Sequence, residues 1–435
     1  MKKTLAILLT LAIVLSIVAG ATAFADGDVV EINIWHMEEV DSRVQQFNMV
    51  ADKFNALHDD IKVTFTVTSW DDAYSKVPAA IMAGNGPDVL QSLPDYGKVI
   101  YDLGVLADVT DMVNELDEEY KFFDSAVSTY TYDGKVYAVP VYDMAQVFWY
   151  RKDIFDAAGL SAPKTWDEVV ECAKALTDKD NGKYGIALPA SLTMATDQVV
   201  YSVMASCGAA DVVGSDDVVT FDNPGTVKAF EYYQELLNYA PVDCDTYAWG
   251  EPQALFNEGT TAMAIEKGQY LSNFEADSGV AAENLGCSLL PVMDDSCTST
   301  AIHYVNSFMV LTQDEAKQAA ILEFFKFLLS EDGYGDFLNA EPGLFLPVTQ
   351  TGSTYESWTS NEVLAKYPEQ VQTLCESAET GALFGFTNGI CDKIGAISGP
   401  NLIAQSLQQM TVNGKSAADA VAWGQKAMED AIDEY

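Results

Sequence analysis

Aromatic side chains recur at or near the ends of the strands and turns that the sequence predicts. The face of an aromatic ring packs against the C–H face of a sugar ring, while carboxylates and amides bond to sugar hydroxyl groups. A groove that carries both kinds of side chain suits a neutral, polyhydroxylated ligand. Each ring taken alone is more often a core residue, so the set carries more weight than any member. The set comprises Trp35, Trp70, Tyr96, Tyr142, Trp149, Trp249, Tyr270, Phe384 and Phe386.

Compact motifs of hydrolytic enzymes are absent from the sequence. It has no Gly-x-Ser-x-Gly and no His-Glu-x-x-His motif. Its 3 histidines and its lack of any Cys-x-x-Cys offer no zinc-binding pattern. A glycosidase-like pair of carboxylates remains open, because 65 acidic residues make any one pair uninformative. We therefore expect no metal, no cofactor and no catalytic residue.

Two glycine-containing segments resemble binding loops but are better explained as turns. Gly84 and Gly86 stand after a predicted helix and before a strand, the reverse of the order in a dinucleotide-binding loop. Segment 178–182 has its glycine one place too early for a calcium loop and lacks the closing Glu. We interpret the first as a helix end and the second as a hairpin-type turn.

The composition excludes several classes of partner. The 435 residues include 23 Lys and Arg against 65 Asp and Glu, a formal net charge of −42. Such a surface repels the phosphates of nucleic acids and of anionic lipids, so we expect no nucleic-acid partner. Because 49% of the residues are hydrophobic, the chain can bury cores, and its length suits two or three domains.

Residues 1–25 have the three parts of a secretory signal peptide. Lys2 and Lys3 precede an apolar run over 5–18, and Ala23-Phe24-Ala25 forms an Ala-x-Ala cleavage site. The run is short for a membrane span. No cysteine follows it at the position of a lipid anchor. We expect an exported protein, in a periplasm or at the cell exterior.

All 7 cysteines lie beyond the predicted signal peptide. An odd number leaves at least one thiol unpaired if the others form disulfides. Cys287–Cys297 or Cys375–Cys391 could close short loops, and the spacing does not decide between them. Cys172 lies in an apolar helical pattern and is predicted to be a buried thiol.

Strand and helix patterns alternate after the signal. Residues 30–35 alternate with period two, 44–57 follow helical spacing, and the same pair of patterns repeats over 61–67 and 74–82 before a strand at 88–90. This order predicts a mostly parallel sheet with right-handed crossovers. Ligands of such sheets lie beyond the carboxyl ends of the strands, so the loops after these strands are the first candidates.

A second α/β section covers about 141–290. It contains a strand at 146–150, a helix that opens at Thr165 with a capping box to Glu168, and a strand at 184–188. Further on, the patterns predict a strand around 308–311 and an apolar helix over about 315–330. From about residue 362 the pattern is helical throughout.

Seven segments occur in the order found in the extracellular solute-binding proteins of family 1, the sugar receptors of ABC importers. The chain resembles that family over essentially its whole length beyond the signal. The segments are 34–35 with the acidic loop that follows, 76–89, 134–140, 149–160, 163–169, 256–263 and 319–328.

The resemblance implies an α/β fold of two lobes, the type II periplasmic-binding-protein fold, with a hinge between the lobes and the ligand in the cleft. It implies chain crossings near Pro140–Tyr142, Leu289–Pro291 and Leu364–Pro368. These crossings divide the chain between lobe 1 and lobe 2. Lobe 1 takes 26–140 and 291–364, and lobe 2 takes 141–290 and 365–435.

The function that the resemblance implies is capture of a carbohydrate, such as an oligosaccharide, and its delivery to the permease subunits of an ABC importer by a monomeric, non-enzymatic receptor. The alternatives are a receptor for another small solute, a polyamine or a ferric ion, and an exported carbohydrate-active enzyme.

Binding positions follow where the motifs align. From the resemblance, the expected binding positions are the loop after the first strand and acidic or aromatic residues further along the chain. Trp70 and Phe386 are added because of their positions and their chemistry. Ser92 stands where a maltose receptor has tryptophan, and Met37 also departs from that pattern, which argues against maltose itself. The expected ligand-binding residues are His36, Glu38, Glu39, Trp70, Ser92, Asp95, Asp143, Tyr270 and Phe386.

Overall fold

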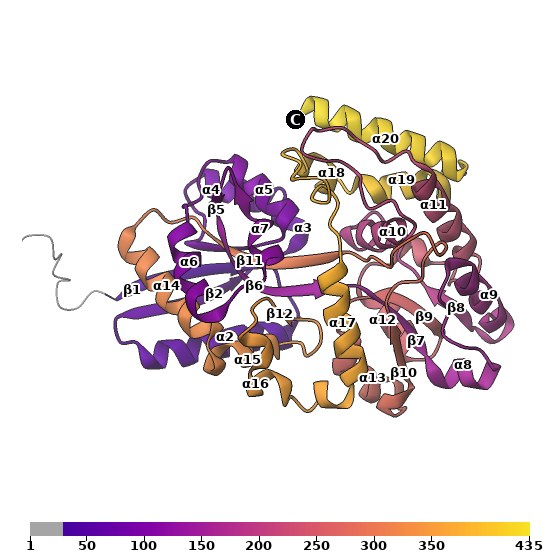
Figure 1. The fold of residues 1–435 in the computed structure, drawn as a ribbon, viewed down its shortest axis with the longest axis horizontal. Helices are drawn as coiled ribbons and strands as arrows, with labels where there is room; N and C mark the ends of the chain where they lie inside the picture. Colours follow the sequence, from indigo (N-terminus) through magenta and orange to yellow (C-terminus); the bar gives the residue numbers. More distant parts are fainter. Residues whose placement is uncertain (1–28) are drawn as a thin grey trace, which may run out of the picture.

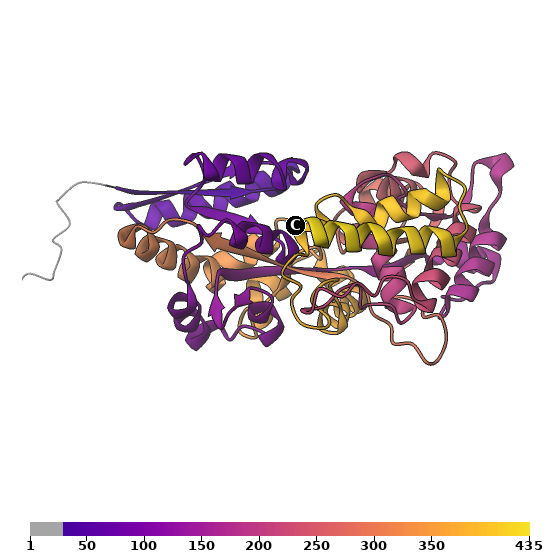
Figure 2. The same ribbon diagram turned by 90° about the horizontal axis from the view of Figure 1, so that it is seen from above.

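The chain forms two large β-sheets that lie in separate lobes along the long axis of the molecule (Figure 1). The computed structural model describes residues 29–435, so the predicted signal peptide lies outside the described residues. Seen from above, the last helix, α20, lies over the second lobe and its end points back toward the first (Figure 2). The two-lobed prediction therefore matches the observed architecture.

Lobe 1 contains a six-stranded sheet in the order β12-β6-β11-β3-β1-β2. β1 pairs in parallel with β2 and β3, as the strand–helix alternation predicts. β11 returns from lobe 2 in the opposite direction and inserts between β3 and β6, so it pairs antiparallel with both. β12 also pairs antiparallel with β6. The prediction of a mostly parallel sheet is thus correct only for β1, β2 and β3. The strands are β1 (Val30–His36), β2 (Ile61–Val67), β3 (Val89–Ser92), β6 (Ala138–Ala145), β11 (His303–Val310) and β12 (Leu346–Pro347), with a separate hairpin of β4 (Thr131–Tyr132) and β5 (Lys135–Val136).

Helices from distant parts of the chain cover this sheet. α2, which follows β1, packs against β2, while α14 packs against β1. The predicted helix over 74–82 is observed as α4 over 76–82, and a short helix that was not predicted, α3, precedes it with Ser69 as its N-cap. The helices of lobe 1 are α2 (Asp41–Leu57), α3 (Trp70–Ala73), α4 (Lys76–Met82), α5 (Pro94–Asp102), α6 (Thr110–Tyr120), α7 (Asp124–Ser128), α14 (Glu315–Leu329), α15 (Glu331–Leu338) and α16 (Glu356–Thr359).

Lobe 2 contains a four-stranded sheet in the order β10-β7-β9-β8. The predicted capping box is present, with Thr165 accepting a hydrogen bond from the Glu168 amide and Glu168 accepting one from the Thr165 amide. The predicted turn before β8 closes at Gly182, whose φ is 65°. The elements are β7 (Val147–Arg151), β8 (Tyr184–Ala187), β9 (Thr261–Glu266), β10 (Leu285–Ser288), α8 (Lys152–Ala158), α9 (Trp166–Leu176), α10 (Met194–Ser206), α11 (Pro224–Leu237), α12 (Gly250–Asn257), α13 (Tyr270–Ser278), α17 (Pro368–Thr380), α18 (Gly395–Ser398), α19 (Leu402–Thr411) and α20 (Ala417–Glu434).

The C-terminal section is not helical throughout, contrary to the prediction. α17 ends at Thr380 and α18 begins at Gly395, so residues 381–394 form a loop. Gly385 and Gly389 have φ values of 81° and 76°, a left-handed conformation that interrupts a helix and that glycine adopts without strain. Beyond this loop, α19 packs against α10 and α20 packs against α11, which places the last helices on lobe 2.

Gln146 lies between the two sheets. β6 ends one residue before it and β7 begins one residue after it, in the other sheet. The Gln146 amide donates to the Ile302 carbonyl at 3.1 Å, so the outgoing strand lies beside the segment that returns into β11. The expected crossing at 140–142 lies within β6, and the change of sheet comes a few residues later.

Two serines of lobe 2 hold this crossing. The Ser202 hydroxyl donates to Gln146 Oε1 at 2.7 Å and accepts from the Ile302 amide at 2.9 Å. The Ser377 hydroxyl donates to the Gln146 carbonyl at 2.7 Å. We call Gln146, Ser202, Ile302 and Ser377 the hinge cluster. It fixes both strands of the crossing to α10 and α17.

His36 lies in the core of lobe 1. Its ring is 0% exposed and packs against Phe47 and Phe65, with ring centroids 4.9 and 5.6 Å away. Neither ring nitrogen has a hydrogen-bond partner among the described residues. Burial disfavours the charged imidazolium and lowers the pKa of His36 to about 4, although Glu38 acts in the opposite direction. The period-two alternation of β1 explains this position, since Ile32, Ile34 and His36 share the buried face.

Gly185 provides a test of the packing between β8 and α9. A β-carbon at this position would meet the Ala173 backbone at 2.4 Å. We expect Gly185→Ala to lower the free energy of unfolding by about 1–3 kcal/mol, because the helix must move away from the sheet. Gly250→Ala is the matched control, since nothing lies within 4 Å of its added carbon. Urea denaturation measures the free energy of unfolding of both variants, and equal values would contradict the prediction.

The buried His36 makes stability depend on pH. Its pKa is lowered in the folded state, so only the unfolded chain takes up a proton between pH 6.5 and about 4. The contribution of the neutral ring is complete above pH 6.5 and is lost as the pH falls toward 4, by about 3 kcal/mol. We expect the unfolding free energy of the wild type to fall by that amount relative to that of His36→Leu between pH 7 and pH 4. If urea denaturation shows that both proteins lose the same unfolding free energy between pH 7 and pH 4, His36 does not cause the dependence on pH.

Candidate ligand-binding site

The loops after β1, β2 and β3 lie at one edge of the lobe 1 sheet, because these three strands are parallel neighbours. This edge faces lobe 2, and α3 and the start of α5 follow directly from it (Figure 1). Five of the expected residues lie in or beside these loops. They are Glu38, Glu39, Trp70, Ser92 and Asp95.

Asp95 lies where the two lobes touch. Its carboxylate is buried in the first turn of α5 and accepts a hydrogen bond from the Tyr74 hydroxyl at 2.8 Å. The same hydroxyl lies 3.3 Å from Oγ of Ser398, which ends α18 of lobe 2. Burial raises the pKa of Asp95, and the hydrogen bond from Tyr74 offsets this in part. Asp95 Oδ1 has no partner among the described residues and is free to accept a further hydrogen bond.

A second buried carboxylate, on lobe 2, interacts electrostatically with Asp95. Asp197 of α10 accepts a hydrogen bond from the Ala404 amide at 2.6 Å. Burial raises the pKa of Asp197 well above its ordinary value, and the charge of Asp95 adds to this. Burial raises the pKa of Tyr304 of β11 well above its ordinary value, and the charges of Asp95 and Asp197 add to this. The neighbouring Gln198 leaves Oε1 buried without a partner among the described residues. We call Tyr74, Asp95, Asp197, Gln198, Tyr304 and Ser398 the inter-lobe cluster.

Glu38 has a different environment, because its carboxylate is already engaged within lobe 1. It accepts hydrogen bonds from Arg43 Nη1 at 2.8 Å, from the Tyr142 hydroxyl at 2.9 Å and from Gln91 Nε2 at 3.3 Å. Arg43 also lies 3.4 Å from Glu341. Buried charges need such partners, so this network fixes the loop after β1 and leaves Glu38 with little capacity for a ligand.

The end of β9 forms the opposing surface on lobe 2. Lys267 Nζ lies 4.0 Å from the ring centroid of Trp249 and 3.4 Å from Glu266 Oε1. Burial lowers the pKa of Lys267, while Glu266 and Glu38 act to raise it. Gln269 Oε1 is buried without a partner among the described residues. This strand end therefore presents a cation, an indole ring and an amide next to lobe 1.

Gly268 sets how closely the lobes approach here. A β-carbon on Gly268 would meet the Gly343 carbonyl of lobe 1 at 1.8 Å, so no other residue fits without movement of the backbone. The Ser272 hydroxyl donates to the Pro342 carbonyl at 3.2 Å beside it. The two lobes are thus in direct contact at this point.

The expected aromatic residues divide between the core and the surface. Tyr270 is 0% exposed and stacks on Trp149, with ring centroids 5.3 Å apart and 10° between planes. Phe256 contacts Tyr270 edge-on at 5.0 Å, which places the ring among core residues of lobe 2. Trp70 is half-buried and lies 6.1 Å from Tyr96. Phe386 is half-buried in the loop before α18.

Three other expected residues have separate positions. Ser92 is buried and donates to the Leu93 carbonyl at 2.8 Å. Asp143 lies 3.0 Å from His303 Nδ1, beside α17. Burial lowers the pKa of His303, but Asp143 outweighs it and the net shift is upward. Glu39 is exposed at the end of the loop after β1.

The structure thus brings Asp95 to the contact between the lobes and leaves Trp70 half-buried beside Tyr96 of lobe 1. It places His36, Ser92 and Tyr270 inside a lobe. Sequence reasoning missed Tyr74, Gln198, Tyr304 and Lys267. Tyr74 belongs to an apolar helical pattern that predicts a core residue, and no local signal marks the other three.

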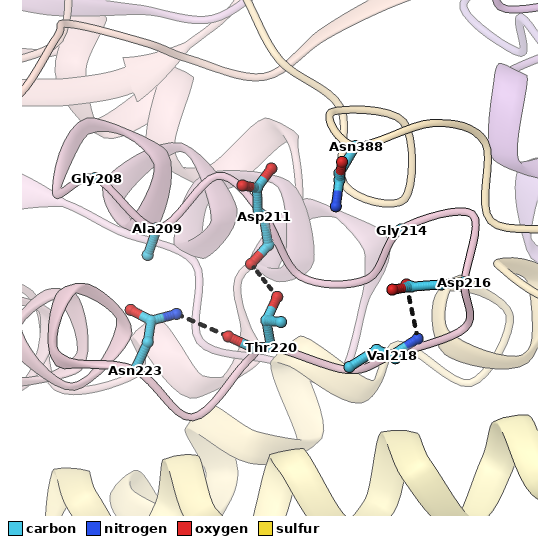
Figure 3. A pocket seen from close by; sticks show the side chains of 9 residues that line it. All are labelled: Gly208, Ala209, Asp211, Gly214, Asp216, Val218, Thr220, Asn223 and Asn388. Carbon is cyan, nitrogen blue, oxygen red and sulfur yellow. Dashed lines mark hydrogen bonds between the residues drawn. The ribbon is translucent and has the colours of Figure 1, made fainter.

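A separate hollow of about 290 Å³ lies on lobe 2, between the loop after α10 and the loop before α18 (Figure 3). Its polar groups mostly bond one another, as where Thr220 Oγ1 donates to the Asp211 carbonyl at 2.9 Å. None of the expected residues lines it. Its lining residues are Gly208, Ala209, Asp211, Gly214, Asp216, Val218, Thr220, Asn223 and Asn388.

Two further features concern the whole described chain. Among residues 29–435, no three His, Cys, Asp or Glu side chains come together in a way that could hold a metal ion. No helix in this range has the length and apolar character needed to cross a membrane.

Comparison with known proteins identifies the family. The model for the bacterial extracellular solute-binding protein family matches residues 41–335. The putative ABC transporter periplasmic-binding protein YcjN of Escherichia coli K12 is 28% identical over 378 residues, 84% of each chain. The diacetylchitobiose binding protein DasA of Streptomyces coelicolor is 26% identical over 329 residues, 74% of each chain.

Solved structures agree on the fold. The structure of maltose-bound T. maritima MalE3 matches with a TM-score of 0.78 at 20% identity, covering 92% of this chain and 100% of that one. The predicted two-lobed, periplasmic-binding-protein-like fold is therefore confirmed, and so is the resemblance on which it was based. With more than half of its length matched by the family model, the chain belongs to the bacterial extracellular solute-binding protein family.

Proposed function

We propose that this protein is the substrate-binding component of an ABC importer and that it binds a carbohydrate between its two lobes. The observation that carries the proposal is the set of buried hydrogen-bonding atoms without partners where the lobes meet. These atoms are Asp95 Oδ1, Gln198 Oε1 and Gln269 Oε1, together with Gln146 Nε2 beside the hinge. A buried polar atom without a partner costs about 1–3 kcal/mol, and sugar hydroxyl groups would satisfy such atoms.

The relatives support the same ligand class. DasA is named for diacetylchitobiose, and the MalE3 structure holds maltose. In this chain, Trp70 of lobe 1 and Trp249 of lobe 2 have half-buried rings, of which the first contacts Tyr96 and the second lies under Lys267 Nζ. We propose that these two rings stack on the sugar, and that Asp95, Gln198 and Gln269 bond its hydroxyl groups.

The remaining expected residues have supporting roles in this proposal. Glu38 holds the loop after β1, while His36, Ser92 and Tyr270 pack inside their lobes. Asp143 pairs with His303 near the hinge. Glu39 and Phe386 lie at the edge of the site and contact larger ligands.

Binding is coupled to closure in this proposal. The unpartnered atoms come from both lobes, so a sugar gains all its hydrogen bonds only when the lobes are together, and it shifts the population toward the closed form. The permease then recognises the closed protein. We further propose that the protein acts as a monomer, without enzymatic activity, outside the cytoplasm. The family resemblance predicts 26–140 and 291–364 as lobe 1 and 141–290 and 365–435 as lobe 2. In this proposal the bounds move to the ends of β6 and β11, so that lobe 1 takes 29–145 and 303–363 and lobe 2 takes 147–302 and 368–435.

A thermal-shift screen of residues 26–435 tests the ligand class. The panel holds mono- and oligosaccharides, spermidine and ferric citrate. A ligand at 100 times its dissociation constant stabilises the native state by about 2.7 kcal/mol, so the true ligand raises the melting temperature. We expect a shift with one glycan series and no new reducing ends after prolonged incubation. A shift with spermidine or iron alone, or release of reducing ends in proportion to protein, would contradict the proposal.

Asp95→Asn tests the site itself. Loss of a charged acceptor is expected to weaken binding of the glycan found in the screen by about 10- to 100-fold, measured by calorimetry. Asp111→Asn is the matched control, since Asp111 is exposed in the first turn of α6. Equal affinities for the two variants would remove Asp95 from the site.

A further inference from the structure

Two of the seven cysteines lie close together in lobe 2. Cys207 is 2% exposed and ends α10, and Cys297 is half-buried in the loop between β10 and β11. A β-carbon on Gly208, the residue after Cys207, would lie 3.5 Å from Cys297 Sγ. The two cysteines are 90 residues apart in the chain (297 − 207), so the fold and not the local sequence brings them together.

Backbone hydrogen bonds hold the two segments next to each other. The Met293 amide donates to the carbonyl of Ser206, the residue before Cys207, at 3.3 Å. The loop then turns at Asp294, whose carbonyl accepts from the Cys297 amide at 3.0 Å. This turn brings the Cys297 thiol back toward the end of α10. Burial raises the pKa of Cys207 well above its ordinary value, and negative charge on Cys297 is the next cause.

The other five cysteines have other neighbours. Cys391 Sγ lies 3.6 Å from an Asp217 carboxylate oxygen, and Cys287 lies beside Thr373 of α17. For the remaining three, Cys172, Cys244 and Cys375, burial raises the pKa of the thiol and nearby acidic side chains add to this. The short loops considered from the spacing, 287–297 and 375–391, therefore do not match the neighbours that these thiols have in the fold.

We propose that Cys207 and Cys297 form a dithiol site that a low-molecular-weight disulfide oxidises to an intramolecular disulfide. The Cys297 thiolate, the more exposed of the two, attacks the oxidant and releases one thiol, which leaves a mixed disulfide on Cys297. The Cys207 thiolate then attacks the Cys297 sulfur and releases the second thiol. Two protein thiols lose two electrons and two protons, and one disulfide oxidant becomes two thiols.

The position suits a structural crosslink in an extracytoplasmic protein. Both cysteines belong to lobe 2, so the bond closes a 90-residue loop (297 − 207) without linking the two lobes. A crosslink over so long a loop restricts the unfolded chain and stabilises the fold. The disulfide leaves the hinge between the lobes free to move, so we expect the same sugar affinity with and without the disulfide.

The experiment treats the purified protein, residues 26–435, with oxidised glutathione, followed by alkylation under denaturing conditions, digestion and mass spectrometry. We expect one crosslinked peptide pair containing Cys207 and Cys297, lighter by two hydrogen atoms than the reduced pair. The melting temperature should rise on the order of 5 °C on oxidation and return with reductant.

Three variants sharpen the test. Cys297→Ser should abolish the rise in melting temperature, and Cys207→Ser should retain glutathione on Cys297. Cys244→Ser, a buried thiol with no cysteine beside it, should behave as the wild type. The proposal is overturned if wild-type Cys207 and Cys297 stay alkylatable after oxidation, or if the wild type keeps glutathione on Cys297 as fully as Cys207→Ser does.

Discussion

The pairing of β6 with β11 is the constraint on which the rest of the structure depends. In this ladder Ala145 lies opposite His303, so the strand that leaves lobe 1 and the strand that returns are joined at the same point. The hinge cluster continues the pairing by one step through the Gln146–Ile302 hydrogen bond. Because both strands pass between the lobes side by side, the lobes can rotate about one place without breaking either sheet.

The molecule buries several carboxylates near the contact between its lobes. A chain with a net charge of −42 keeps most of its acids in solvent, yet Glu38, Asp95, Asp197 and Glu266 are buried near the contact between the lobes. Glu38 is neutralised within lobe 1 by Arg43, and Glu266 lies beside Lys267. Asp95 and Asp197 accept hydrogen bonds from neutral donors, the Tyr74 hydroxyl and the Ala404 amide. Within residues 29–435, the fold thus compensates Glu38 and Glu266 with charge, whereas no ion pair is formed by Asp95 or Asp197.

Local patterns predict part of this molecule well. β1, α2 and β2 follow from periodicity, and Thr165 caps α9 as its neighbours require. The family resemblance and a strand-end position both point to Asp95, which the structure places at the contact between the lobes. Tyr270 is misleading, since the ring that covers it, Trp149, is 121 residues away (270 − 149) and no local signal reveals the stack. Sequence reasoning does not identify Tyr304 and Gln198 for the same reason, because their proposed role depends on which distant segments meet at the hinge.

The place of β11 in the sheet has a consequence for how the chain folds. β11 lies between β3 and β6, but it is synthesised about 160 residues after β6 ends, once nearly all of the first part of lobe 2 has been made. Until it arrives, the facing edges of β3 and β6 have unpaired backbone groups, which are prone to pair with other chains. The sheet of lobe 1 therefore begins before the sheet of lobe 2 and is completed after it. A chaperone that shields these two edges would shorten the period in which the nascent protein can aggregate.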